Sequence, residues 1–189
     1  MRKCGLLILC FCLVKICSAQ DPNFSQFFVS PLTLNPALTG KFNGNVRVAG
    51  NYRDQWPDIS KAFVTSTISV DLPILRGKIS DLDTWGVGLM AMTDKTANGV
   101  LSGNFISLTT AYHKGLDEEG LQQIGVGFQG TYSNKRLDGT KLNFLDELDQ
   151  NGGWTVPSSE AIDNRQVNTS YFDVAVGALY NGSTDGYDN

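Results

Sequence analysis

The sequence predicts an all-β fold, an antiparallel up-and-down transmembrane β-barrel, of which this chain forms the N-terminal portion with about six strands. Three observations support this fold class. Six segments alternate apolar residues with small or polar ones, which is the period of a strand with two unlike faces. Several of these segments reach the ~10 residues that a tilted strand needs to cross a bilayer. Aromatic residues lie near the predicted strand ends, where barrels carry aromatic girdles; they are Tyr52, Trp56, Trp85, Tyr112, Tyr132, Phe172 and Tyr180.

The first 19 residues have the layout of a secretory signal peptide. Arg2 and Lys3 form a basic start, an apolar run follows, and Cys17-Ser-Ala19 supplies small residues for cleavage. The apolar run is shorter than the ~18 residues of a spanning helix. We therefore expect export through the Sec pathway and a mature chain that begins at Gln20. All four cysteines lie in this leader, so the mature chain has no thiol for a disulfide, a metal site or a nucleophile.

The mature chain is acidic. Loss of the leader removes three of the 15 basic residues and none of the 19 acidic ones, which leaves 12 basic residues and a net charge of −7. Such a chain has no basic surface for nucleic acid. No later apolar run has the length of a spanning helix, so the mature chain either is soluble and exported or crosses a membrane as strands.

Residues 20–43 precede the first predicted strand and form a separate N-terminal segment, periplasmic or lumenal in location. Its three prolines restrict the backbone and remove amide donors, so it cannot form a long helix or a central strand. Its aromatic side chains are costly to leave in water. We expect the segment to dock inside the barrel as a plug or on a periplasmic partner, and a mobile tail is the alternative. The predicted docking residues are Phe24, Phe27, Phe28, Asn35 and Pro36.

The alternating segments assign faces to the strands. The predicted strands cover about 44–56, 61–73, 84–94, 100–114, 121–134 and 170–180. Val126, Phe128, Val174 and Val176 fall on apolar faces, and we predict that they face lipid. The small and polar faces would line the lumen. The predicted lumen residues are Arg47, Arg53, Gln129 and Asp173, with Asp173 hydrogen-bonded near Arg47 or Arg53.

The connections suit a barrel whose N-terminus is periplasmic. Residues 44–189 form the barrel portion, in which 135–169 is a long outer loop and 117–120 a tight inner turn. Outer-membrane barrels have short periplasmic turns and longer extracellular loops. Because the smallest such barrels use ~8 strands, we expect further strands to follow those of this chain.

Three sequence features invite a chemical interpretation. Residues 125–130 match the dinucleotide pattern G-x-G-x-x-G, but they lie inside a predicted strand with no helix after them, so we interpret these glycines as strand residues. Residues 146–153 resemble a calcium loop, although its twelfth position is Ser158 where a glutamate is needed. We interpret it as a solvated acidic loop, with a weak calcium site as the alternative. His113 has no partner for a triad or zinc site, so we predict a polar strand-end residue, no cofactor and no catalysis.

Two blocks of the sequence carry a family resemblance. The first contains Gln20-Asp-Pro-Asn-Phe-Ser-Gln-Phe, Asn35-Pro-Ala followed by Gly40, and Asn51-Tyr-Arg-Asp-Gln-Trp-Pro57. The second is Ser170-Tyr-Phe-Asp-Val-Ala-Val-Gly-Ala-Leu-Tyr180. Together they resemble the PorP/SprF family of outer-membrane proteins, which belong to the type IX secretion and gliding motility machinery of Bacteroidetes.

The resemblance implies a non-enzymatic barrel in the outer membrane. Such a protein would bind the C-terminal signal domains of cargo proteins or link the translocon to periplasmic components. Its partners would be membrane lipid, cargo domains and other type IX components. Two alternatives stay open: a generic porin-like barrel, and a soluble exported β-sandwich that binds carbohydrate.

Overall fold

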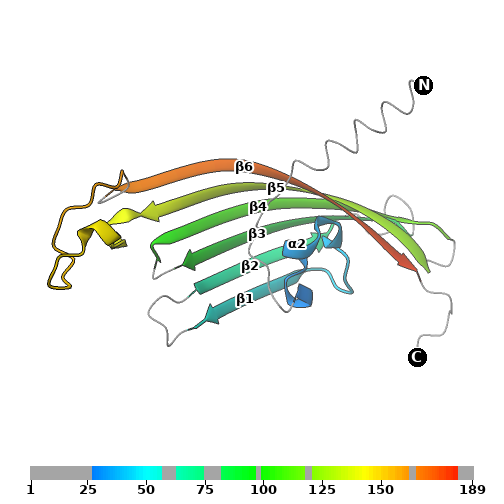
Figure 1. The fold of residues 1–189 in the computed structure, drawn as a ribbon. Helices are drawn as coiled ribbons and strands as arrows, with labels where there is room; N and C mark the ends of the chain where they lie inside the picture. The colour runs from blue at the N-terminus through cyan, green and yellow to red at the C-terminus, as the bar shows by residue number, and fades with distance from the viewer. Residues whose placement is uncertain are drawn as a thin grey trace, which may run out of the picture.

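Six strands form one antiparallel sheet in the order β1-β2-β3-β4-β5-β6 (Figure 1). The computed structural model describes residues 27–56, 63–74, 82–96, 99–117, 121–161 and 165–182. The predicted signal peptide and Phe24 lie outside these residues. The strands are β1 Arg47–Gln55, β2 Phe63–Pro73, β3 Thr84–Thr96, β4 Leu101–Gly115, β5 Gln122–Asp138 and β6 Gln166–Gly182.

The predicted fold class is confirmed. Each strand pairs with the next one along the chain, which is the up-and-down arrangement of a barrel wall. In Figure 1 the strands lie side by side and curve along their length, with β1 and β6 at the two edges. None of the helices in the described part of the chain has the length and apolarity to cross a membrane.

The last two strands are longer than predicted. β5 continues to Asp138 and β6 begins at Gln166, so the connection between them is shorter than the predicted loop 135–169. The sequence alternation fades there because residues 134–136 are all polar, while the ladder of backbone pairs continues through Asn134 and Ser170. Polar side chains also join the two strands, since Asn134 donates to Asn168 at 2.8 Å and to Ser170 at 2.9 Å.

The two faces of the sheet differ in chemistry as the period-two pattern predicts. The outer face carries large apolar side chains that remain exposed, among them Ile68, Leu89, Leu108, Phe128, Val174 and Val176. The inner face carries small and polar side chains that are buried, among them Thr65, Thr67, Ser69, Ser107, Thr109 and Ser133. Polar groups are therefore buried on one face while apolar groups are exposed on the other, the reverse of a water-soluble sheet packed on a core.

Three short helical turns precede β1 and lie against the inner face: η1 Phe27–Val29, α2 Pro31–Leu34 and η2 Pro36–Leu38 (Figure 1). Pro31 and Pro36 stand at the starts of α2 and η2, where the missing proline N–H has no helical acceptor to lose. Within residues 27–43, the prolines at 31 and 36 divide the chain into single turns.

The connection between β5 and β6 is a folded loop. It contains η4 Gly139–Lys141 and η5 Leu145–Glu147, and an antiparallel bridge joins Leu148 to Trp154. Its turn is held by Asp149, whose carboxylate accepts hydrogen bonds from the backbone N–H groups of Asn151 and Gly153, each at 2.8 Å.

Candidate functional site

Residues 27–40, here called the docked segment, cover part of the inner face and form the best-defined site of the molecule. Within this segment Leu32 is 1% exposed and Ala37 and Thr39 are fully buried. The turn η2 lies over β4, β5 and β6, while η1 lies beside β1. The segment therefore spans the sheet from one edge to the other.

Asn35 joins the docked segment to β6. Its side-chain oxygen accepts from the N–H of Ala37 at 2.8 Å, which caps η2, and its side-chain nitrogen donates to the carbonyl of Ala178 at 2.9 Å. At the opposite edge, Asn51 of β1 donates to the carbonyl of Val29 at 3.0 Å. Side-chain amides thus satisfy the segment's own backbone and fasten it to both edge strands.

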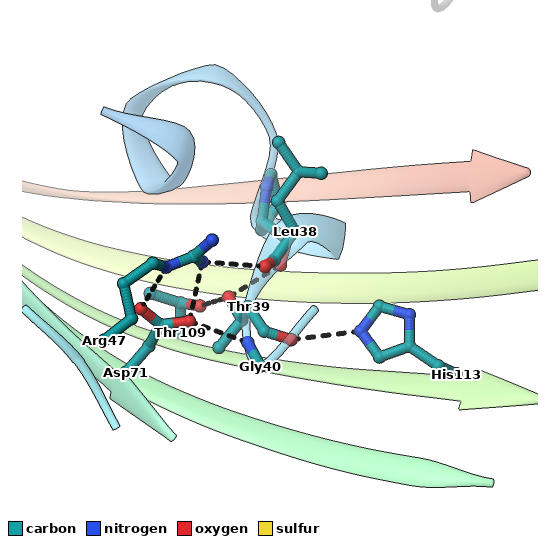
Figure 2. A network of polar contacts seen from close by, with 8 residues as sticks. Leu38, Thr39, Gly40, Arg47, Asp71, Thr109 and His113 are labelled. Atoms are coloured by element: carbon teal, nitrogen blue, oxygen red, sulfur yellow. Dashed lines mark hydrogen bonds and ion pairs between the residues drawn. The ribbon is translucent and has the colours of Figure 1, made fainter. Parts of the chain in front are cut away.

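Thr39 and Gly40 are held by a polar network at the centre of the sheet (Figure 2). The Thr39 hydroxyl donates to the carbonyl of Pro36 at 2.7 Å and also bonds the hydroxyl of Thr109. His113 Nε2 lies 3.0 Å from the Thr39 carbonyl, and because a carbonyl only accepts, this contact places a proton on Nε2. The N–H of Gly40 donates to Asp71 Oδ2 at 2.8 Å. The Thr39 hydroxyl, the Thr39 carbonyl and the Gly40 N–H therefore each have a partner on the sheet or within the segment.

Arg47 and Asp71 form the charged part of the network (Figure 2). The guanidinium donates twice to the carboxylate, from Nε at 2.8 Å and from Nη2 at 2.7 Å, and Nη2 also donates to the carbonyl of Leu38 at 3.0 Å. The Asp71 side chain is 1% exposed and the Arg47 side chain 23%. Bidentate geometry and the extra bonds to Leu38 and Gly40 offset the cost of burying the Asp71 carboxylate and of partly burying the Arg47 guanidinium.

Glycines on the inner face make room for the docked segment. A Cβ at Gly86 would overlap the Thr39 carbonyl, one at Gly127 would overlap the backbone of Pro36 and Ala37, and one at Gly177 would overlap the Asn35 side chain. Gly40 itself has φ of 72°, and a Cβ there would lie 2.6 Å from the Cα of Gly86. The small face predicted from the sequence is therefore a shaped seat for residues 35–40.

The predicted docking residues occupy different positions. Asn35 and Pro36 lie in the seat, with Pro36 buried. Phe28 is 69% exposed, and the buried apolar residues of the segment include Leu32 and Ala37. Phe27 belongs to η1, and nothing further is described of its side chain.

The predicted lumen residues lie on the inner face but do not form one cluster. Arg53 donates to the Thr65 hydroxyl at 3.0 Å, and Gln129 donates to the Thr131 hydroxyl at 3.2 Å. Asp173 lies on β6, at the edge opposite the β1 arginines. No contact of Asp173 with Arg47 or Arg53 occurs among the described residues, because strands β2 to β5 lie between β6 and β1. Arg47 pairs instead with Asp71 on the neighbouring strand.

Sequence reasoning missed the residues that hold the docked segment. His113 lies near the end of β4 as expected, but it is buried and contacts Thr39 rather than solvent. Asp71, Thr109 and the glycines of the seat also went unrecognised as a site. A signal existed, since all of them fall on small or polar strand faces, but the segment that covers them comes from far away in sequence.

The two other sequence features have structural explanations. Gly125 and Gly127 of the G-x-G-x-x-G pattern lie on the inner face of β5, and in the described chain the strand is followed by the single turns η4 and η5 rather than by an α-helix. In the acidic loop, Asp146 accepts hydrogen bonds from Ser158 and Ser159, as Asp149 does from its own turn. Among the residues that the structure describes, no group of three or more His, Cys, Asp or Glu side chains could hold a metal ion.

Comparison with known proteins gives one match. The family model described as "Type IX secretion system membrane protein PorP/SprF" matches residues 16–185. No curated protein and no solved structure matches the chain. The family match covers both resembling sequence blocks, the docked segment and all six strands. The chain therefore belongs to the PorP/SprF family of type IX secretion system membrane proteins.

Proposed function

We propose that this chain is a non-enzymatic β-barrel component in the outer membrane that binds the C-terminal signal domains of secreted cargo proteins. The observation that carries the membrane part is the reversed chemistry of the sheet. Leu108, Val174 and Val176 are mostly exposed on the outer face, while threonines and serines are buried on the inner face. In membrane barrels, apolar residues that face lipid alternate along each strand with polar residues that face the interior.

Lipid is energetically a more favourable environment than water for the outer face. Each exposed large apolar side chain forgoes about 1.5–3 kcal/mol that burial would supply, and the outer face carries many of them across all six strands. In a sandwich, a second sheet would cover these exposed apolar side chains, whereas the described strands all join one sheet. A hydrocarbon environment removes the same side chains from water without further protein contacts.

The partner part of the proposal rests on the family and on the docked segment. Membership in a type IX secretion family supports a place in that machinery. The docked segment is anchored from Leu32 to Gly40, while Phe28 and Leu34 remain mostly exposed beside the inner face. Exposed apolar side chains on an anchored segment suit contact with another polypeptide. A link between the translocon and periplasmic components would use the same surface.

A pull-down tests the proposal. The tagged full-length protein would be purified in detergent from outer membranes of its own host and mixed with a purified cargo C-terminal signal domain. We expect retention of that domain and no retention of the same cargo without it. Absence of retention would overturn cargo binding. Co-purified periplasmic type IX components would then support the linking role, and ion conductance in planar bilayers a porin-like one.

A further inference from the structure

A cavity of about 240 Å³ lies on the inner face beside α2, between the docked segment and strands β3 to β6. One wall is apolar and consists of Met90, Met92 and Phe105. The other carries Gln129, Ser133 and Asp173. Strand register brings these walls together, because Met90, Ser107, Thr131 and Asp173 are successive partners across the sheet.

On the polar wall, side-chain oxygens of Gln129, Ser133 and Asp173 have no hydrogen-bond partner among the described residues. Gln129 Oε1 and Ser133 Oγ are buried atoms without a hydrogen bond, and Ser133 is 0% exposed. The Gln129 nitrogen is already used, since it donates to Thr131. Asp173 is exposed on the edge strand β6, and its carboxylate has no hydrogen bond or ion pair to any residue in the described ranges. Burial without a partner costs about 1–3 kcal/mol for each of the Gln129 and Ser133 oxygens, so a ligand that hydrogen-bonds to them would be favoured.

The lining selects the chemistry of that ligand. Its unpaired groups are a carboxylate, an amide oxygen and a hydroxyl, and no Lys, Arg or His lines the cavity. Because these groups accept hydrogen bonds and one of them carries a negative charge, they favour a ligand that is cationic and donates hydrogen bonds. The facing thioethers and aromatic ring suit an aliphatic stem and are themselves favourable neighbours of a cation. The volume accommodates one side chain rather than a drug-sized molecule.

We propose that this cavity binds an ammonium or guanidinium group carried on an apolar stem. A lysine or arginine side chain of another polypeptide and a free alkylamine share this chemistry. The cation would lie against Asp173 with its donors toward Gln129 and Ser133, and its stem would lie along Met90, Met92 and Phe105. This inference does not depend on the cargo binding proposed above.

The chain provides its own reporters for a test. Met90 and Met92 are the only methionines besides Met1, and both line the cavity. The full-length protein in lipid nanodiscs, labelled with ¹³C at the methionine methyl groups, would be titrated with Nα-acetyl-lysine methylamide. Parallel titrations would use n-butylammonium and the uncharged Nα-acetyl-norleucine methylamide. We expect saturable shifts of the Met90 and Met92 resonances with a cationic probe and none with norleucine.

Variants separate the cavity from general charge effects. Asp173→Asn should weaken binding of the cationic probe about tenfold or more, because the amide oxygen can still accept a hydrogen bond but no longer carries a negative charge. Asp54→Asn removes the same charge from the exposed outer face of β1 and should leave binding unchanged. Ser133→Ala provides a second test, with weaker binding expected and the charge intact.

The outcomes are distinct. Shifts with the lysine probe but not with butylammonium would support the proposal with a polypeptide side chain as the source of the cation. Shifts with butylammonium but not with the lysine probe would support it with a free alkylamine as the source. Shifts with both probes would support binding of a cation from either source. Equal shifts with norleucine, or unchanged binding in Asp173→Asn, would overturn the proposal. Equal weakening in Asp54→Asn would overturn it as well.

Discussion

At the scale of single residues, the site that receives residues 35–40 depends both on glycines, which have no side chain, and on residues that form hydrogen bonds with the segment. Gly86, Gly127 and Gly177 lie on three different strands, and each allows the backbone or a side chain of residues 35–40 to approach within the space of a Cβ. Thr39, Asp71 and His113 then supply the directed contacts. Close approach and full hydrogen bonding occur at the same positions, so small changes here have large effects.

The first prediction concerns Gly127. Gly127→Ala should displace the docked segment, because the new methyl group meets the backbone of Pro36 and Ala37 and no flexible side chain can move aside. We expect an overpacking cost of about 1–3 kcal/mol and faster proteolysis within residues 27–40 of the membrane-inserted protein. Gly50→Ala is the matched control, since a Cβ there meets only the Thr67 carbonyl at 3.8 Å. Equal protease resistance of both variants would contradict the conclusion that Gly127 makes room for the docked segment.

The second prediction concerns the pair of Arg47 and Asp71. Arg47→Met should lower the free energy of unfolding by about 3 kcal/mol, the lower end expected for a broken buried pair because Arg47 is 23% exposed. The loss arises chiefly from the unpaired Asp71 carboxylate. Urea unfolding in detergent micelles measures it. The double variant Arg47→Met with Asp71→Leu should recover part of the loss, and a double variant less stable than Arg47→Met would argue against this origin.

At the scale of elements, each strand separates two environments with a period of two residues. In β6, Val174 is mostly exposed on the outer face, while its neighbour Ala175 lies on the inner face. The β5–β6 loop is held differently, by aspartate side chains that bond its backbone. We therefore expect the stability of the strand to depend on charge introduced on its apolar face, and the order of the loop to depend on pH.

The third prediction uses those neighbours in β6. Val174→Arg should destabilise the membrane-inserted protein by about 2–4 kcal/mol, the cost of Arg on the lipid face of a barrel near the midplane. Ala175→Arg places the same charge one residue away on the inner face, beside Asp173, and should cost less. Unfolding from lipid vesicles, followed by the heat-dependent gel mobility of the protein, measures both. The opposite ranking would mean that the two faces have been assigned the wrong way round.

The fourth prediction concerns the pH dependence of the loop. The backbone N–H of Gly153, the Thr155 hydroxyl and the backbone N–H of Asn151 lower the pKa of Asp149. A folded-state pKa below the unfolded value means that this carboxylate stabilises the turn at neutral pH. That stabilisation is lost only as the pH falls through the lowered pKa. We expect Trp154 fluorescence, in a Trp56→Phe, Trp85→Phe background, to stay constant down to the usual aspartate range of about 3.9 and to change below it.

Asp149→Asn is the control for that titration, because an amide does not titrate there. It should reduce the amplitude of the acid transition. A transition midpoint above the usual aspartate range, or one unaffected by the substitution, would show that Asp149 does not govern the order of the loop.

At the scale of the whole molecule, the chain is a sheet with an apolar outer face and a polar inner face that its own N-terminal residues partly cover (Figure 1). The docked segment thereby places Phe28 and Leu34 beside the inner face. The buried residues Leu32, Ala37 and Thr39 are different from these exposed ones. If Phe28 and Leu34 contact a partner as proposed, mutation can therefore separate that contact from the anchoring of the segment.

The fifth prediction exploits that separation. Changing Phe24, Phe27 and Phe28 together to Ser should leave membrane insertion intact, because the buried anchors of the segment are unaltered. Retention of the cargo signal domain should fall at least tenfold, since each aromatic side chain buried by a partner contributes about 1.5–3 kcal/mol. Leu145→Ser, in the β5–β6 loop, is the control. Wild-type retention by the triple variant would remove these aromatics from the partner surface.

The sequence by itself determined the strands and their faces. Alternation is a local property, so the apolar residues Val126, Phe128, Val174 and Val176 could be placed on one face without knowledge of the fold. The prolines likewise excluded a long helix before β1. Strand ends in β5 and β6 were less predictable, because hydrogen-bonded pairing continues where both faces become polar.

Only the tertiary structure decided what covers the inner face. Thr39 and Thr109 are 70 residues apart in sequence, and Asn35 and Ala178 are 143 apart. No local pattern specifies such contacts, because they depend on the register of all six strands and on which side the chain enters the sheet. For the same reason Asp71 could not be assigned to Arg47, nor His113 to Thr39, from residue types alone. A glycine on a strand indicates that something approaches closely, and the folded chain determines what that is.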